Sequence, residues 1–484
     1  MEKLDMSIDT IIKKLKKISG NNSNLFSRKL KVGNDTLAYI YLESVSSDEI
    51  ISNTILKSIS IDSKTTIINI QNLFKKLENT IPGSKLKIID NYNDMFYHLA
   101  SGFTCIITEN ERKAIAIETR KQLDRGVTEV TSEPSVKGPK DSFTENHITN
   151  LGLIRKRIKD PNLWFEEVIV GRRTKTKVSI GYIKDVALKE NVEKIKKKIE
   201  NIDIDGIIDS SYIRDFIVEK KSIFPQILTT ERPDMACGHL LEGKIVVLVE
   251  NSPLALILPT ILVDFIHASE DYYQKSTNAN LTRILRVIAF IVTIITPAFF
   301  IAITNFNQEV IPNNLLISIA IQREGVPFPT IVEILLLITM FEVLRESDVR
   351  TPTAMGTSIS IVGALVLGDA AVTAGIVSPI VVIIIAFTAI SGLLFTDIDI
   401  INSFRWWRLL FLLGAATLGL IGFVIVFLIF ITEISSQDSI GTPYLIPIAP
   451  FKKNDLKDTF TTSSRDNMVY RSSYLSKNKR RLGK

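Results

Sequence analysis

The pattern of polar and apolar positions divides the chain into two halves. Up to about residue 245, a Lys, Arg, Asp or Glu recurs every few positions. Beyond that point lie long apolar runs, of which Val287–Thr304 and Leu409–Ile431 contain no charged residue. Runs of about 20 apolar residues can cross a bilayer core as helices, and a helix pairs its backbone groups internally in hydrocarbon. We therefore predict an α/β soluble N-terminal region followed by an α-helical polytopic membrane domain, residues 251–432.

Four segments of the second half are predicted to span the membrane. They are Val287–Thr304, Ser358–Ala374, Ile376–Phe395 and Leu409–Ile431. A Gly/Pro break at residues 375–379 joins the second and third segments and suits a helical hairpin. Two weaker apolar segments, Pro253–Ile266 and Phe328–Leu344, contain acidic residues or a proline. We interpret both as membrane-associated, either crossing the bilayer or lying at its surface.

The first half mixes strand and helix patterns, which predicts two α/β subdomains, residues 1–125 and 151–250. Short runs rich in β-branched and aromatic residues indicate strands. These runs are residues 36–42, 65–70, 103–107, 114–118, 164–170, 175–182 and 244–249. Helices are predicted at residues 93–99 and 192–199, and a further helix is predicted to begin near Ser47. The Pro- and Gly-containing stretch at residues 126–150 is predicted to be a connecting loop.

Composition adds constraints on the class of protein. The 484 residues are 46% hydrophobic and 23% charged, with a net charge of +6, and the mean hydropathy is +0.21. These averages exclude a collagen-like, disordered or disulfide-stapled chain. Cys105 and Cys237 allow at most one bridge and form no CxxC motif.

The C-terminal tail, residues 433–484, is basic. From Phe451 onwards it holds ten Lys or Arg against three Asp. The positive-inside rule therefore predicts a cytoplasmic tail. The charged start of the chain does not have a signal-peptide pattern, so we expect a cytoplasmic N-terminus and an even number of crossings, four or six. The tail is predicted to be a solvated end or to contact anionic lipid headgroups.

Sequence motifs do not indicate an enzyme. Gly238–Lys244 has the GxxxxGK spacing of a phosphate-binding loop, but Ile245 stands where Ser or Thr would hold Mg²⁺. The sequence contains neither HExxH nor GxSxG, and its four histidines are far apart. We expect no catalysis, no cofactor, no metal site and no nucleic-acid partner.

One face of the segment Ser358–Ala374 carries an unusual stripe. At helical spacing it presents Ser358, Val362, Leu365, Val366, Asp369 and Thr373. An acid at membrane depth is costly and usually faces a bundle interior or water. If several copies meet around an axis, Asp369 would form a carboxylate ring and the apolar residues a constriction that gates by dewetting. Alternatively, this face packs against other helices of the same chain.

The segment Phe328–Glu346 adds Glu333 and Glu342 to the acidic residues of this half. One interpretation is an acidic vestibule that attracts cations. The alternative is an amphipathic helix at the membrane surface with its acids in water.

A set of short motifs runs from the soluble half into the membrane half. A loop motif comprises Glu133, Pro134, Lys137, Gly138 and Pro139, with a Phe-Thr-Glu at 143–145. The other stretches are residues 224–226, 232–234, 270–273, 308–312, 323–329, 360–366 and 374–379. Together they resemble the A-subunit family of nutrient germinant receptors in endospore-forming bacteria, and the similarity covers about residues 129 to 404.

This resemblance implies a multi-pass protein of the spore inner membrane. Family members work with a transporter-like B subunit, thought to bind the nutrient, and a lipoprotein C subunit. The A subunit is thought to form a homo-oligomeric, ligand-gated cation channel that triggers germination. Three alternatives remain open: an accessory protein related to stage V sporulation protein AF, a secondary transporter, and a small-molecule sensor in the soluble half.

Overall fold

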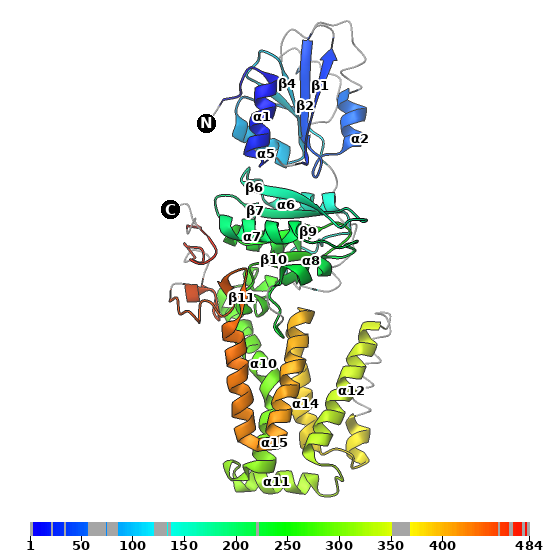
Figure 1. The fold of residues 1–484 in the computed structure, drawn as a ribbon, viewed down its shortest axis with the longest axis vertical. Coiled ribbons are helices and arrows are strands. Elements are labelled where there is room, and N and C mark those ends of the chain that lie inside the picture. Colours follow the sequence, from blue (N-terminus) through cyan, green and yellow to red (C-terminus); the bar gives the residue numbers. More distant parts are fainter. Residues whose placement is uncertain are drawn as a thin grey trace.

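The computed structural model describes most of the chain and shows two α/β units stacked on a set of long helices (Figure 1). The described residues are 3–20, 23–32, 35–56, 74, 86–120, 133, 137–218, 222–350, 368–453, 455–463, 468–476 and 480–481. The predicted strand at residues 65–70 lies outside them.

The first unit is a five-stranded antiparallel sheet with helices on both faces. Its strands have the order β1-β2-β4-β5-β3. Alternate residues of β2 point to opposite faces, as a strand requires. Ala38 and Ile40 pack with the helices α1 and α5, whereas Tyr39 and Tyr41 pack with Ile51 on the other side. The elements are α1 (Ile8–Ile18), β1 (Leu25–Val32), β2 (Asp35–Leu42), α2 (Asp48–Ile50), β3 (Leu86–Ile89), α5 (Tyr92–Ala100), β4 (Phe103–Thr108) and β5 (Ala114–Glu118).

The second unit repeats this topology. Its sheet has the order β6-β7-β9-β10-β8, the same permutation as in the first unit, and a helix again precedes the first strand. The elements are α6 (His147–Arg157), β6 (Leu163–Val170), β7 (Thr176–Ile183), α7 (Lys189–Glu200), α8 (Ser210–Ile217), β8 (Leu228–Thr230), α9 (Pro233–Glu242), β9 (Ile245–Val249) and β10 (Ala255–Leu258). The sequence pattern did not reveal this duplication.

The second sheet corrects the interpretation of Pro253–Ile266 as a membrane-associated segment. Within this segment, β10 pairs antiparallel with both β9 and β8. All four of its residues are buried, because α8 and α9 both contact it. A strand buried on both faces is apolar throughout, so its composition resembles that of a membrane segment.

The predicted connecting loop at residues 126–150 is also shorter than expected, because helix α6 begins at His147, inside that stretch.

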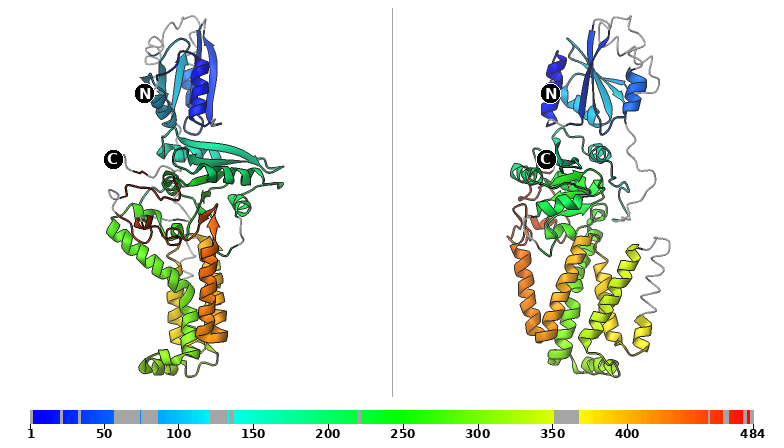
Figure 2. Two further views of the ribbon diagram at one scale, coloured as in Figure 1. Left: turned by 60° about the vertical axis from the view of Figure 1, so that its left-hand side comes forward. Right: turned by 45° about the vertical axis from the view of Figure 1, so that its right-hand side comes forward.

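The other half of the molecule is helical. The helices α10, α14 and α15 run side by side, and α11 crosses them at the end far from the α/β units (Figures 1 and 2). Two helices of the described part are long and apolar enough to cross a membrane, Ser276–Phe306 and Ile398–Ser436. The elements are α10 (Ser276–Ile301), α11 (Asn313–Arg323), α12 (Thr330–Arg350), α14 (Pro379–Gly392) and α15 (Ile398–Ser436), and residues 368–373 are helical too.

Helix α15 is a hairpin of two antiparallel helices (Figure 1). At Gly419 the backbone has φ 61° and ψ −135°, which is outside the helical region. The rings of Trp407 and Phe430 are 4.9 Å apart, whereas a straight helix would separate residues this distant in sequence by about 35 Å. The prediction of one span over Leu409–Ile431 is therefore wrong, because this segment contains the turn between two helices.

The described part of the tail is folded against the second unit, in contrast to the predicted solvated end. Ser476 forms a β-bridge with Ala187. Arg471 donates through Nε to the carbonyl of Leu241 at 2.6 Å, close to the C-terminal end of α9. A basic tail can therefore be an integral part of the fold, despite its composition.

Candidate functional site

A buried arginine joins the loop motif to the second α/β unit. Arg232 donates to the carbonyl of Pro139 at 3.0 Å and to that of Glu133 at 3.3 Å, and it pairs with Asp234 at 2.9 Å. Pro233 occupies the first turn of α9, where its fixed φ favours a helix start. Asp234 is favourable in this turn because its charge faces the positive end of the helix dipole. The Arg-Pro-Asp motif thus begins α9 and fixes the loop at the same place.

The glycine of the loop motif makes room for an aromatic ring. Gly138 has φ +122°, and a Cβ at this position would lie 2.7 Å from the ring of Tyr273. The Tyr273 hydroxyl donates to Asp234 at 2.7 Å. Two of the family stretches therefore pack directly on the loop motif. Of the other loop residues, Lys137 is exposed, and Pro134 lies outside the described residues.

Two carboxyl groups with raised pKa values lie where the loop approaches the helical half. Burial raises the pKa of Glu133 to about 7, and the charge of Asp397 adds to this rise. Thr230 donates to Glu133 Oε2 at 2.7 Å. Asp397 caps α15 by accepting from the backbone of Asp399 and Ile400, at 2.9 and 3.0 Å. Burial raises the pKa of Asp397 to about 6.

An aromatic cluster connects residues 222–226 to both halves of α15. The ring of Phe224 is 6.4 Å from Trp407, 5.8 Å from Phe430 and 6.4 Å from Tyr444. Ser403 donates to the carbonyl of Ile223 at 2.5 Å. The Phe-Pro-Gln stretch thus lies between the two helices of the hairpin and the start of the tail.

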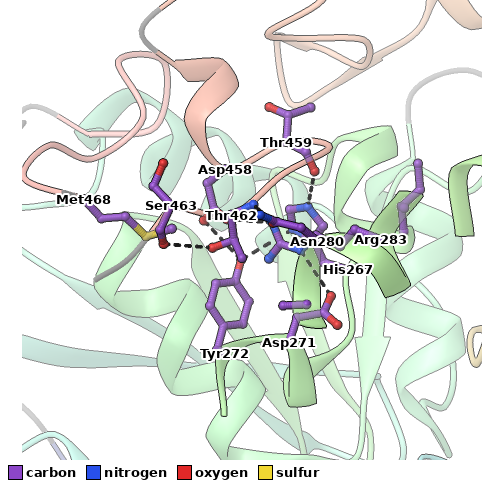
Figure 3. Close-up of polar contacts among 12 residues, drawn as sticks. His267, Asp271, Tyr272, Asn280, Arg283, Asp458, Thr459, Thr462, Ser463 and Met468 are labelled. Carbon is purple, nitrogen blue, oxygen red and sulfur yellow. Dashed lines mark hydrogen bonds and ion pairs between the residues drawn. The ribbon is translucent and has the colours of Figure 1, made fainter. Parts of the chain in front are cut away.

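A buried ionic cluster joins α10, the segment before it and the tail (Figure 3). Arg283 of α10 contacts Asp271 at 3.2 Å and Asp458 of the tail at 2.8 Å. His267 Nε2 donates to the carbonyl of Thr459 at 2.7 Å. Burial lowers the pKa of His267. We call Asp271, His267, Arg283, Asp458 and Thr459 the tail clasp.

These contacts bring together four of the eight stretches on which the family resemblance rests. The loop motif and residues 224–226, 232–234 and 270–273 all lie at the junction between the second α/β unit and the helices. Buried charge pairs and rings make this junction a mechanical connection, because displacing one member leaves another unpaired at a cost. Sequence reasoning identified the motifs but not their convergence. It also missed the tail clasp, for which Arg283 and Arg286 at the edge of the uncharged run were the available signal.

The predicted pore stripe is described only in part. Ser358, Val362, Leu365 and Val366 lie outside the described residues. Asp369 and Thr373 lie four residues apart on the helical turns 368–373, and both are exposed, whereas Ala371 between them is buried. Among the described residues, these two polar side chains therefore share an exposed face of the helical turns.

The two residues of the predicted acidic vestibule lie in different surroundings. Glu333 is fully buried and accepts from the backbone and hydroxyl of Ser378, at 2.8 and 2.7 Å, so that it holds the start of α14. Glu342 is partly exposed and contacts three arginines: Arg345, Arg405 and Arg408.

A polar cleft of about 320 Å³ lies between the two α/β units. Its charged lining residues are Glu43, Glu145, Glu167, Lys177 and Glu250. His147 also lines it, with Nε2 bonded to Ser179 at 2.8 Å and with Nδ1 buried and lacking a partner among the described residues. Burial lowers the pKa of His147.

Comparison with known proteins gives a consistent result. The family model described as Bacillus/Clostridium GerA spore germination protein matches residues 13–474. Spore germination protein KA of Bacillus subtilis (strain 168) is 37% identical over 451 residues, which cover 92% of this chain and 82% of the relative. Spore germination protein B1 of the same organism is 31% identical over 459 residues, which cover 94% of both chains.

One solved structure also matches the first half. It is the crystal structure of the N-terminal domain of the A subunit of the Bacillus megaterium spore germinant receptor GerK3. It is 30% identical to this chain, with a TM-score of 0.42, and the match covers 54% of this chain and 98% of that one.

Proposed function

Because this chain belongs to the Bacillus/Clostridium GerA family of spore germination proteins, we propose that it is the A subunit of a nutrient-responsive germination receptor. Proteins of this family are not enzymes. In this proposal the helical half lies in the spore inner membrane, with both termini in the cytoplasm. Its partners are a transporter-like B subunit, a lipoprotein C subunit and further copies of this chain.

The observation that carries the proposal is the buried junction between the two halves. A ligand-gated device needs an element that passes a change in the sensing part to the membrane part. Here Phe224 packs on both helices of α15 and Ile223 accepts from Ser403 of α15. The charge of Asp397, at the start of α15, reaches Glu133 of the loop motif, and the tail clasp connects the second unit to α10. A rigid shift of the second unit would therefore move both helices.

The hairpin in α15 supports an even number of crossings. Each of its halves has about 20 residues, the length that a span needs. Together with α10, α12, α14 and the predicted span Ser358–Ala374, the hairpin brings the number to six. Six is the larger of the two numbers of crossings, four or six, that place both termini in the cytoplasm. With six crossings the tail is on the same side of the membrane as the α/β units.

The pore is proposed to be lined by the stripe that includes Asp369 and Thr373. Their shared exposed face in the single chain supports this assignment, since such a face is free to meet its copies around an axis. A cysteine scan over residues 356–375 with a charged, water-soluble thiol reagent tests it. We expect labelling at positions 358, 362, 366, 369 and 373, and no labelling at these positions would contradict the pore.

The chain is well suited to this scan. Its natural cysteines, Cys105 and Cys237, are both buried, and burial raises the thiol pKa of each, that of Cys237 to about 12. Background labelling should therefore be low. The matched control is I383C on α14, where Ile383 is 62% exposed on an apolar helix. In a membrane this position faces lipid and should not react.

The cleft between the α/β units supports a second role, in sensing a small molecule. Four carboxylates and one lysine favour a ligand with a protonated amine. Titration calorimetry of the full chain with free amino acids, and with neutral sugars as a control, tests this. We expect heat of binding only with the amines, and its loss in E167Q. Equal responses to both ligand classes would contradict this role.

A further inference from the structure

Arginines on two helices carry more positive charge than the one carboxylate that they surround can neutralise. Glu342 of α12 lies 2.7 Å from Arg405 and 3.2 Å from Arg408, both of α15, and 3.4 Å from Arg345 of its own helix. Three guanidinium groups thus share one carboxylate. Even if Glu346, one turn further along α12, is counted, positive charge remains in excess. We call Arg345, Arg405 and Arg408 with Glu342 the arginine cluster.

One hydrogen-bond donor of the cluster, the Nε of Arg405, is buried and unpaired among the described residues. The Nη1 of the same side chain donates to Asn402 at 3.1 Å. A guanidinium held in this way on one side presents its remaining donors in a fixed direction.

Two cavities with apolar walls flank the arginine cluster. Their volumes are about 480 and 280 Å³, and both are lined by Ile338, Glu342, Arg405 and Arg408. The remaining lining is largely aliphatic and aromatic. At its outer edge, Trp406 is 62% exposed and Leu393 is 74% exposed. The cluster therefore lines both cavities, which we call the groove, and the cavity that holds Trp406 lies between α12 and α15.

The groove and the cluster together match the two parts of one type of molecule. A phosphodiester accepts hydrogen bonds from the forked donors of guanidinium groups, and acyl chains match an apolar groove. The cluster lies in the first turns of α15, at the end of the helical half that faces the α/β units (Figure 1). Tryptophan is enriched at that depth of a membrane, and the cytoplasmic leaflet is rich in anionic lipid.

We propose that the arginine cluster and its flanking groove bind one anionic phospholipid of the cytoplasmic leaflet, with the phosphate on Arg405 and Arg408 and an acyl chain along the groove. The phosphate of the lipid neutralises the positive charge of the guanidinium groups that Glu342 leaves in excess. This inference rests on the proposed function only in placing the helical half in a membrane.

Tryptophan fluorescence provides a direct test, because Trp406 lines the groove. The full chain is reconstituted in phosphatidylcholine vesicles that contain a small fraction of brominated lipid, either phosphatidylglycerol or phosphatidylcholine. Bromine on an acyl chain quenches a nearby indole. We expect brominated phosphatidylglycerol to quench more strongly at equal mole fraction, and W406F to lose the difference between the two lipids.

Substitutions of the cluster should change this preference in opposite directions. R405Q and R408Q should each lower the preference for phosphatidylglycerol about fivefold, the effect typical of one basic residue near an anionic surface. E342Q removes the competing carboxylate and should raise the preference. The matched control is R173Q, which removes an exposed arginine of the second α/β unit and should change nothing.

The outcomes separate this inference from the proposed function. Equal quenching by the two brominated lipids would overturn the lipid site while leaving the membrane domain in place. Quenching by neither lipid would overturn both. If millimolar inorganic phosphate abolished the preference in vesicles, the cluster would be a site for free phosphate and the lipid assignment would be wrong. An unchanged preference in E342Q would indicate that the arginines only join α12 to α15.

Discussion

At the scale of single residues, Glu133 makes the junction sensitive to pH. Burial raises its pKa from 4.5 to about 7. Between these two values the folded protein keeps a proton that the unfolded chain has lost, so stability falls as pH rises through this window. We expect E133Q to match the natural protein below pH 4.5 and to be more stable above pH 7, by about 2–3 kcal/mol.

Thermal unfolding in detergent between pH 4 and pH 8 measures this difference. The amide oxygen of E133Q can still accept from Thr230, so the change removes charge and little else. The matched control is E190Q, which neutralises an exposed carboxylate on α7 and should leave the pH profile unchanged. Parallel profiles for E133Q and the natural protein would contradict a buried, proton-holding Glu133.

At the scale of elements, Gly419 decides where α15 turns. Its φ of +61° is unfavourable for other residues, and a Cβ there would lie 2.6 Å from the Cβ of Phe306. We expect G419A to destabilise the protein by about 1–3 kcal/mol, the usual cost of a strained backbone position, measured as a fall in the unfolding midpoint. The matched control is G392A on α14, where a Cβ would meet Thr293 at an ordinary 3.6 Å. Equal midpoints for the two variants would contradict the turn.

The elements also indicate what sequence patterns can and cannot predict. The strands near residues 36–42, 103–107 and 164–170 were predicted correctly, because side chains alternate between the faces of a strand. The hairpin of α15 was not. Arg405 and Arg408 are charged residues inside its first helix, and they made the apolar run seem to begin at Leu409. Their contacts with Glu342 join two helices that are far apart in the sequence. The number of charges along one segment does not reveal that those charges are paired with another segment.

The same limit applies to the candidate site. The sequence displayed each motif of the junction, but more than a hundred residues separate Glu133 from Asp397 and Ile223 from Ser403. The proximity within each pair depends on how the second unit sits on the helices, and local periodicity carries no information about this. The shared topology of the two α/β units was missed for a related reason. The two units share the order of their strands, and strand order is not apparent from the residues of each strand.

At the scale of the whole molecule, one continuous core connects the first α/β unit to the helices. It contains Leu4 of the first unit, Phe165 of the second, Trp407 of α15 and Tyr444 of the tail. The tail clasp adds an ionic connection beside this core. We therefore expect the tail to stabilise the placement of the second unit on α10, although it is far from both in sequence.

Removing the tail's carboxylate should release the tail without unfolding the protein. In D458N, Arg283 keeps its contact with Asp271, so we expect a modest loss of about 1–3 kcal/mol for one charged hydrogen bond. Limited trypsin digestion should then cleave after Lys457 faster than in the natural protein. The matched control is D455N, whose carboxylate bonds to the exposed Ser473 and should leave the cleavage rate unchanged. Equal rates in D458N and D455N would contradict the clasp.

The clasp should respond to pH in the opposite direction from Glu133. Although burial opposes its charge, nearby His267 and Arg283 hold the pKa of Asp458 below its ordinary value of 3.8. The stabilisation is therefore present above pH 3.8 and is lost as pH falls through the lower, folded value. Trypsin cannot report in acid, so pepsin digestion of the tail is the measurement. We expect the tail of the natural protein to become more sensitive as pH falls below 3.8, while D458N is sensitive throughout. A natural protein with constant sensitivity down to pH 2 would show that Asp458 does not hold the tail.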